Sequence, residues 1–122
     1  MMTKKELLER ASKVYANPNL VYCPAWKCMA EYDRDTGYYT WGASWNSLTN
    51  SDNALDLVTR LQLSVMAHDD GVSVSDKTGR VIVEVNYDDE RVSSANEAMR
   101  LAITTAAAAV AAEVMGCSEV PN

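Results

Sequence analysis

The sequence predicts a single domain of the α+β type, in which four mainly antiparallel strands form one sheet layered against three helices. Three segments place apolar residues at helical spacing, and two further segments alternate apolar and polar residues around a turn that contains glycine. The order is a helix followed twice by a hairpin and a helix. A chain of 122 residues fits one domain, which at this size buries about two thirds of its unfolded surface.

The first expected element is an amphipathic helix over residues 3–15. Thr3 and Glu6 have the spacing of a capping box, in which each residue satisfies a backbone N–H of the other. Apolar side chains then recur at helical spacing. The segment from Asn17 to Asn19 contains a proline and is expected to end the helix.

The second expected element is a hairpin over residues 28–45, and residues 20–26 before it are expected to be irregular because they surround a proline. Turn-forming residues at 33–37 divide the hairpin, and their glycine supplies the positive φ that a tight turn requires. Trp41 and Trp45 are an even number of positions apart in the second strand. Their side chains are therefore expected to share one inward face.

A helix over residues 52–63, a hairpin over 72–87 and a helix over 95–115 complete the expected fold. The middle helix follows an Asn-Ser-Asp run with N-cap chemistry, and the second hairpin alternates valine with polar residues. The last helix has the clearest signals, because a capping box begins at Ser94 and Gly116 is a natural stop.

The charge balance argues against nucleic acids and membranes as partners. The chain carries 17 acidic and 11 basic residues, a formal net charge of -6, which repels polyphosphates and anionic lipid surfaces. Its longest uncharged apolar stretch, residues 101–112, is too short to cross a bilayer. The first residues lack the apolar run of a secretory signal, so a cytoplasmic location is expected.

Cysteine usage is typical of a reducing compartment. The three cysteines are Cys23, Cys28 and Cys117, an odd number, and they lack the paired spacings of zinc sites. We therefore expect reduced thiols, no metal ion and no cofactor.

No motif in the sequence indicates catalysis. His68 is the one histidine, and it precedes Asp69 and Asp70 where a surface loop is expected. A histidine can act as a general base, but no serine or cysteine has the context of a nucleophile elbow, and glycine-rich phosphate loops are absent. We therefore expect a protein that is not an enzyme. In an enzyme, His68 with either aspartate would be the only plausible acid–base pair.

Seven tryptophan and tyrosine residues lie within 24 positions, whereas phenylalanine is absent. Either they form the core, or they form a surface that is buried only when a partner binds, because their polar tips suit both places. The spacing of Trp41 and Trp45 favours the core for these two. Tyr22, Trp26 and Tyr38 are the candidates for an exposed contact.

Four segments of the chain carry a resemblance to a group of phage proteins. They are a strand ending in Trp41-Gly-Ala-Ser-Trp45, a helix from Asn53 to Arg60, a valine-rich hairpin, and an alanine-rich helix that begins with Asn96 to Ala102. Over about residues 39–114 the chain resembles the small phage and prophage proteins grouped as the phage ABA-sandwich domain, and more loosely NinX-like phage proteins. The resemblance implies an α/β/α sandwich, a phage or prophage origin and no known catalysis. It supplies no site residues.

The leading functional hypothesis is a non-catalytic accessory protein of a phage or prophage that binds a host or phage protein in the host cytoplasm. An aromatic and acidic face makes the contact in this hypothesis, with Tyr22, Trp26 and Tyr38 as its candidate residues. The resemblance adds counter-defence or regulation as the setting, by analogy alone.

The alternative hypothesis is an oligomer that sequesters a small nucleotide signal. An aromatic ring stacks on the base in this hypothesis, and Arg60, Arg80 or Arg100 holds the phosphates. Residues 106–112 are rich in alanine, so one side of the last helix carries only small side chains and a second copy of the chain can approach it closely. A homodimer across the last helix is therefore expected.

Overall fold

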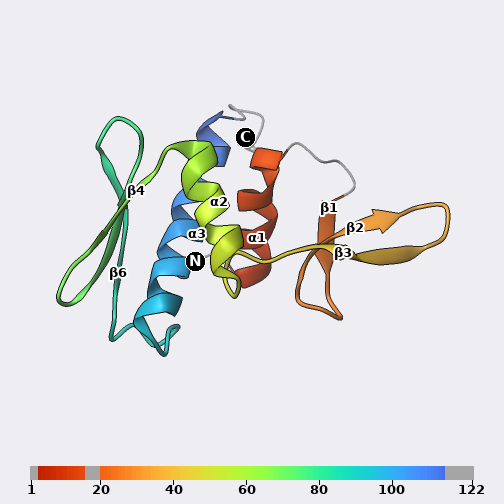
Figure 1. The fold of residues 1–122 in the computed structure, drawn as a ribbon, viewed down its shortest axis with the longest axis horizontal. Helices are drawn as coiled ribbons and strands as arrows, with labels where there is room; N and C mark the ends of the chain where they lie inside the picture. Colours follow the sequence, from red (N-terminus) through yellow and green to blue (C-terminus); the bar gives the residue numbers. More distant parts are fainter. Residues whose placement is uncertain (1–2, 16–19, 115–122) are drawn as a thin grey trace.

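The computed structural model describes residues 3–15 and 20–114. Within these ranges it describes the backbone alone at residues 15, 40–44 and 112–114. Over these residues the chain forms three α-helices and two separate three-stranded antiparallel sheets. The helices lie between the sheets (Figure 1), so the layers follow the order sheet, helices, sheet.

Each sheet is a simple meander in which every strand pairs with the next one along the chain. The elements are, in chain order, α1 (Lys4–Ala11), the 3₁₀-helix η1 (Ser12–Tyr15), β1 (Leu20–Cys23), β2 (Cys28–Asp33), β3 (Tyr38–Trp45), α2 (Ser51–Leu61), β4 (Ser64–Ala67), β5 (Gly71–Ser75), β6 (Val81–Asn86) and α3 (Ala95–Val114).

The α+β class is confirmed, but the single four-stranded sheet and the α/β/α sandwich are wrong. Two short strands, β1 and β4, were not predicted, and each adds a third strand to one of the predicted hairpins. β1 ends at Cys23, so Pro24 lies in the turn that follows and does not interrupt the strand. The two hairpins lie on opposite sides of the helices (Figure 1), so they do not pair with each other.

The predicted cap of the first helix is confirmed, although the helix is shorter than expected. The Glu6 N–H donates to Thr3 Oγ1 at 3.1 Å, and the Thr3 N–H donates to Glu6 Oε1 at 3.0 Å. The α-helix ends at Ala11 and continues as η1 to residue 15. The predicted stop at Asn17 to Asn19 lies outside the described residues.

The other two helices start close to their predicted positions. Asn50 caps α2 by accepting a bond from the Asn53 N–H at 3.1 Å, and α2 ends at Leu61 because Gln62 adopts a left-handed conformation with φ 54°. At α3 the Glu97 N–H donates to Ser94 Oγ at 3.2 Å. The predicted stop at Gly116, and Met115 and Cys117 beside it, lie outside the described residues.

The β2–β3 hairpin contains an irregularity that simple alternation does not describe. Its turn has the predicted positive φ at Gly37, 79°. Further along, the pairing moves from Glu31 opposite Thr40 to Met29 opposite Trp45, which places several extra residues on β3. Trp45 is buried, as predicted, at 8% exposure. The side chain of Trp41 is outside the described part, so its predicted inward direction stays a prediction.

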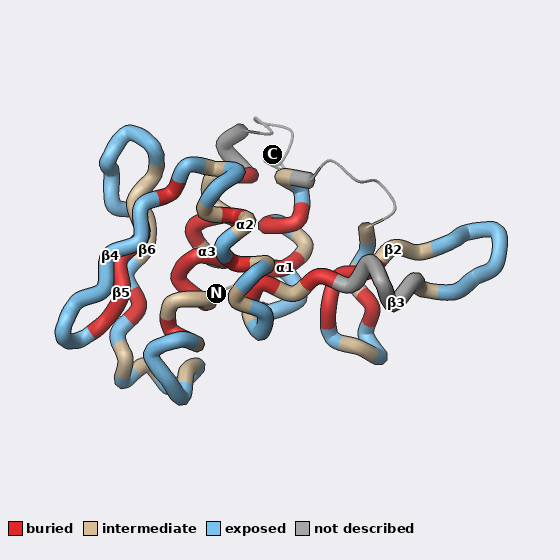
Figure 2. The backbone as a smooth tube through the Cα atoms, viewed as in Figure 1, coloured by how far each residue is buried: buried red, intermediate tan, exposed pale blue. Residues whose placement is uncertain are grey.

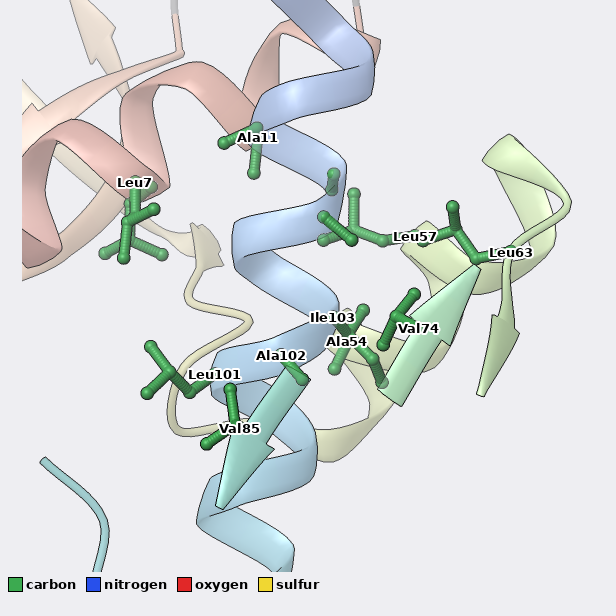
Figure 3. Packing of buried hydrophobic residues seen from close by; sticks show 14 of the residues in the cluster. Leu7, Ala11, Ala54, Leu57, Leu63, Val74, Val85, Leu101, Ala102 and Ile103 are labelled. Carbon is green, nitrogen blue, oxygen red and sulfur yellow. The ribbon is translucent and has the colours of Figure 1, made fainter. Parts of the chain in front are cut away.

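The core lies around α3, which packs against α1, α2, β5 and β6. Figure 3 shows Leu57 from α2 and Val74 from β5 close to Ile103 of α3. Burial follows the helices and the strands that face them, whereas the hairpin tips are exposed (Figure 2). The alanine side of α3 that suggested a dimer is buried by the chain itself at Ala106, Ala107, Ala108 and Ala111. The oligomeric state stays a prediction.

Within the described residues, no helix has the length and the apolar character needed to cross a membrane.

Leu57→Ala is expected to lower the free energy of unfolding by about 2–5 kcal/mol, because the leucine side chain is fully buried in the core cluster. The matched control is Leu55→Ala on the same helix, where the side chain is 52% exposed and the expected loss is below about 0.5 kcal/mol. Urea denaturation followed by circular dichroism measures both. Equal losses would contradict the core described here.

Candidate functional site

Two hollows contain four of the residues that the sequence predicted to bind a partner or ligand, namely Tyr22, Trp26, Tyr38 and Arg100. The first, which we call the basic cleft, has a volume of about 390 Å³ and is lined by residues of α1, β1, the β1–β2 turn, the β3–α2 segment and α3. The second, which we call the aromatic hollow, is more open and has a volume of about 450 Å³. It lies between the end of β1, the β1–β2 turn and the start of β3.

The basic cleft carries a charge opposite to that of the whole chain. Its charged lining consists of Lys4, Lys27, Arg91 and Arg100, with Glu97 as the one acid. The chain as a whole has a net charge of -6. The side-chain carboxylate of Glu97 also accepts a hydrogen bond from the Ser93 hydroxyl. This excess of positive charge makes the cleft a local attractor for anions.

Arg100 is held in a fixed orientation at the wall of the basic cleft. Its Nε donates to the carbonyl oxygen of Leu48 at 3.0 Å, and its Nη1 donates to Ser51 Oγ at 3.2 Å. Both acceptors are neutral, so they orient the guanidinium without cancelling its charge.

The β3–α2 segment is fixed by Asn46, which connects three parts of the chain. Its Nδ2 donates to the carbonyl oxygen of Lys27 at 3.0 Å, its Oδ1 accepts from the Leu48 N–H at 2.9 Å, and its own N–H donates to Asn53 Oδ1 at 2.9 Å. Lys27 has a left-handed backbone with φ 54°, which is uncommon for a residue with a side chain. These bonds set the positions of Lys27 and of the carbonyl that holds Arg100.

Arg91 reaches the basic cleft from the loop before α3 and pairs there with Asp89. The guanidinium donates from Nε to Asp89 Oδ1 at 3.0 Å and from Nη2 to Oδ2 at 2.8 Å. The Arg91 side chain and then its backbone N–H, as hydrogen-bond donors, lower the pKa of Asp89 to about 2. The Asp89 carboxylate in turn raises the pKa of Arg91.

Two of the predicted binding residues meet in the basic cleft. Tyr22, on β1, and Arg100, on α3, both line it. The Tyr22 ring is half-buried, and Nζ of Lys5 lies over it at 5.9 Å from the centroid. Sequence reasoning missed Lys4, Lys27 and Arg91, because nothing in their spacing indicates that they converge.

The other two predicted aromatic residues, Trp26 and Tyr38, meet in the aromatic hollow. Tyr38 is 75% exposed. The Trp26 and Tyr39 rings lie 6.0 Å apart between centroids, and the Tyr32 and Tyr39 rings lie 5.1 Å apart in an edge-on arrangement. The rings therefore support one another and leave Tyr38 facing solvent.

Acidic residues accompany Tyr38 at the tip of the β2–β3 hairpin. Asp33 is its direct cross-strand partner, and Asp33 Oδ1 accepts from the Asp35 N–H at 2.9 Å. Both aspartates are exposed. The hairpin tip thus presents two carboxylates, with the exposed Arg34 between them, beside an exposed aromatic ring.

The remaining predicted arginines belong to neither hollow. Arg60 pairs with Asp56 at 2.9 Å along α2, and Arg80 pairs with Asp76 at 3.3 Å across the β5–β6 turn. Their predicted role in holding a ligand stays a prediction.

His68 lies in the β4–β5 turn, at the surface as expected. Its Nε2 lies 2.9 Å from Ser73 Oγ, and its backbone N–H donates to the carbonyl oxygen of Gly71 at 2.7 Å. Asp69 and Asp70 are exposed in the same turn. Among the described residues, no three His, Cys, Asp or Glu side chains gather closely enough to hold a metal ion.

Cys23 and Cys28 are free, buried and directly opposite each other across the β1–β2 pair. Burial raises the pKa of the Cys28 thiol, and the neighbouring Cys23 raises it further. Cys117 lies outside the described residues.

Comparison of the chain with protein-family models, with curated proteins and with solved structures finds no match.

Arg91→Gln is expected to raise the pKa of Asp89 from about 2 toward its ordinary value of 3.8, because the arginine side chain is the largest cause of the low pKa. The rise is partial, since the backbone N–H of residue 91 still donates to Asp89. Carboxyl NMR titration measures it, with Asp76 as the control because its low pKa comes first from Thr78. An unchanged Asp89 titration would refute the assigned cause.

The lowered pKa of Asp89 determines how the free energy of unfolding changes with pH. The Asp89–Arg91 pair stabilises the fold at pH values above the ordinary carboxyl pKa, and this contribution is lost as the pH falls toward 2. The wild-type protein is therefore expected to lose more stability than Arg91→Gln over that acidic range.

In a Cys117→Ser background, Cys28 is expected to react slowly with iodoacetamide at neutral pH. Burial and a raised pKa both reduce the amount of accessible thiolate. Mass spectrometry of timed samples measures the labelling, and the same protein in urea is the control that should label fast. Rapid labelling of the native protein would show that the β1–β2 end is open.

Proposed function

We propose that this chain is a non-catalytic binding protein that docks on another protein through the aromatic hollow and the acidic hairpin tip beside it. The observation that carries the proposal is the exposure of Tyr38, 75%, next to the supported rings of Trp26 and Tyr39. Tyrosine and tryptophan are enriched among the residues that dominate binding energy at interfaces. The exposed ring of Tyr38, beside the packed rings of Trp26 and Tyr39, therefore suits a protein–protein contact.

The position of the surface supports the same proposal. The β2–β3 hairpin projects away from the helices (Figure 1), so a partner reaches its tip without meeting the body of the domain. Asp33 and Asp35 place carboxylates at this tip. A partner surface with basic side chains around an apolar socket is therefore the complement, and the net charge of -6 favours its approach.

The biological setting in this proposal rests on sequence resemblance alone. A phage or prophage accessory protein in the host cytoplasm, acting in counter-defence or regulation, is what similarity to the phage ABA-sandwich proteins implies. The sheet–helices–sheet order differs from the layering expected from that similarity. The docking surface itself is argued from the described residues and does not depend on the setting.

Tyr38→Ala is expected to weaken partner binding about tenfold or more, as loss of an interface anchor does. Immobilised wild-type protein is used to recover a stoichiometric partner from bacterial lysate, and the purified pair is then measured by calorimetry. Leu55→Ala, an exposed substitution on α2 outside both hollows, is the control and should bind like the wild type.

Two results would count against the proposal. One is the recovery of no stoichiometric partner at low and moderate salt. The other is a purified partner whose affinity is the same for Tyr38→Ala, Trp26→Ala and the wild type.

A further inference from the structure

We propose that the basic cleft binds a small organic phosphate with a flat ring, of the size of a mononucleotide. The cleft is separate from the aromatic hollow, so this inference does not depend on the docking function. Its starting point is the concentration of Lys4, Lys27 and Arg100 in one cavity of a chain whose net charge is -6, beside Arg91, which is paired with Asp89.

The guanidinium of Arg100 and the backbone of Lys27 are set in place before any ligand arrives. Arg100 is oriented by the Leu48 carbonyl and the Ser51 hydroxyl through Nε and Nη1, and these bonds leave the donors of Nη2 for a ligand. The backbone of Lys27 is anchored by Asn46. A preorganised guanidinium suits a phosphate, because its planar fork matches two phosphate oxygens.

Glu97, which lines the cleft, and Asp89, which pairs with Arg91, both accept hydrogen bonds from the chain itself. Asp89 accepts both side-chain bonds of Arg91, and Glu97 accepts from the Ser93 hydroxyl. Within the described part of the chain, neither Lys4 nor Lys27 lies at ion-pair distance from a carboxylate. The charge of these two lysines is therefore available to an anion.

The rest of the cleft is apolar and suits the body of the ligand. Leu8, Leu48 and Leu101 contribute aliphatic surface, and Tyr22 contributes a half-buried ring. Tyr22 and Arg100 line the same cleft, so the proposed ligand stacks its ring on the tyrosine and places its phosphate at the arginine. The volume of about 390 Å³ lies at the small end of the range for ligand sites, which fits a mononucleotide better than a polymer.

Isothermal calorimetry at constant ionic strength tests the proposal with the four nucleoside 5′-monophosphates and a 3′,5′-cyclic monophosphate. Inorganic phosphate supplies the charge without a ring, the free nucleoside supplies the ring without a charge, and benzoate supplies a ring with a carboxylate. At least one nucleotide is expected to bind about tenfold or more tightly than each of the three fragments.

Lys27→Gly separates loss of the site from loss of the fold. Glycine adopts positive φ without strain, so the variant is expected to keep or gain thermal stability while nucleotide affinity falls about tenfold. Lys77→Gln removes one exposed positive charge in the β5–β6 turn, outside the cleft, and should leave affinity unchanged. Tyr22→Leu should weaken nucleotide binding and leave the response to inorganic phosphate as it is.

Three results would overturn the proposal. They are nucleotide affinities no higher than that of inorganic phosphate, tighter binding of benzoate than of any nucleotide, and equal losses in Lys27→Gly and Lys77→Gln. Tyr38→Ala should bind nucleotide normally, so failure of this site and failure of the docking surface are distinguishable.

Discussion

The packing of α3 is the constraint on which the rest of this structure depends. This helix contacts α1, α2 and the strands β5 and β6 of the second sheet, and its contact side is built from small residues such as Ala102 and Ala106. Small side chains let neighbouring backbones approach closely, so a short chain can enclose a core between two sheets. Larger residues such as Ile103 and Leu57 then fill the spaces that remain. The second sheet covers α3 through β5 and β6, whereas the first sheet contacts α1 through β1 and β2.

The same helix also positions the basic cleft. Ser47, on the segment between β3 and α2, is fully buried and lies 2.7 Å from Thr104 of α3 through their hydroxyl oxygens. This polar contact inside an apolar core has both groups satisfied, which is the condition under which a buried hydroxyl is tolerated. It fastens the segment to α3 one helical turn beyond Arg100, whose guanidinium binds the same segment at Leu48. The wall of the cleft is thus an extension of the core.

Local signals in the sequence predicted local structure well. The capping box at Thr3, the Asn50 cap and the positive φ at Gly37 are all decided by neighbours within a few positions, and all are confirmed. The strands β1 and β4 were missed because each is four residues long, too short for alternation to be recognised. The division into two sheets depends on those strands and could not be foreseen without them.

The candidate site was predictable only in part. Tyr22 and Arg100 were singled out for their chemistry, and the fold places both in the basic cleft. Lys27 enters it through a left-handed backbone and a bond from Asn46, neither of which leaves a sequence signature. Sites assembled from distant segments depend on tertiary contacts, whereas sequence patterns report mainly on secondary structure.

The turn between β1 and β2 has a consequence for how the two hollows behave together. Trp26 lines the aromatic hollow and the next residue, Lys27, lines the basic cleft. A displacement of this short connection would alter both walls at once, so any molecules bound at the two places would be linked through a common piece of backbone. Thermodynamic linkage makes such an influence mutual: whatever factor one occupant imposes on the affinity of the other, it receives in return.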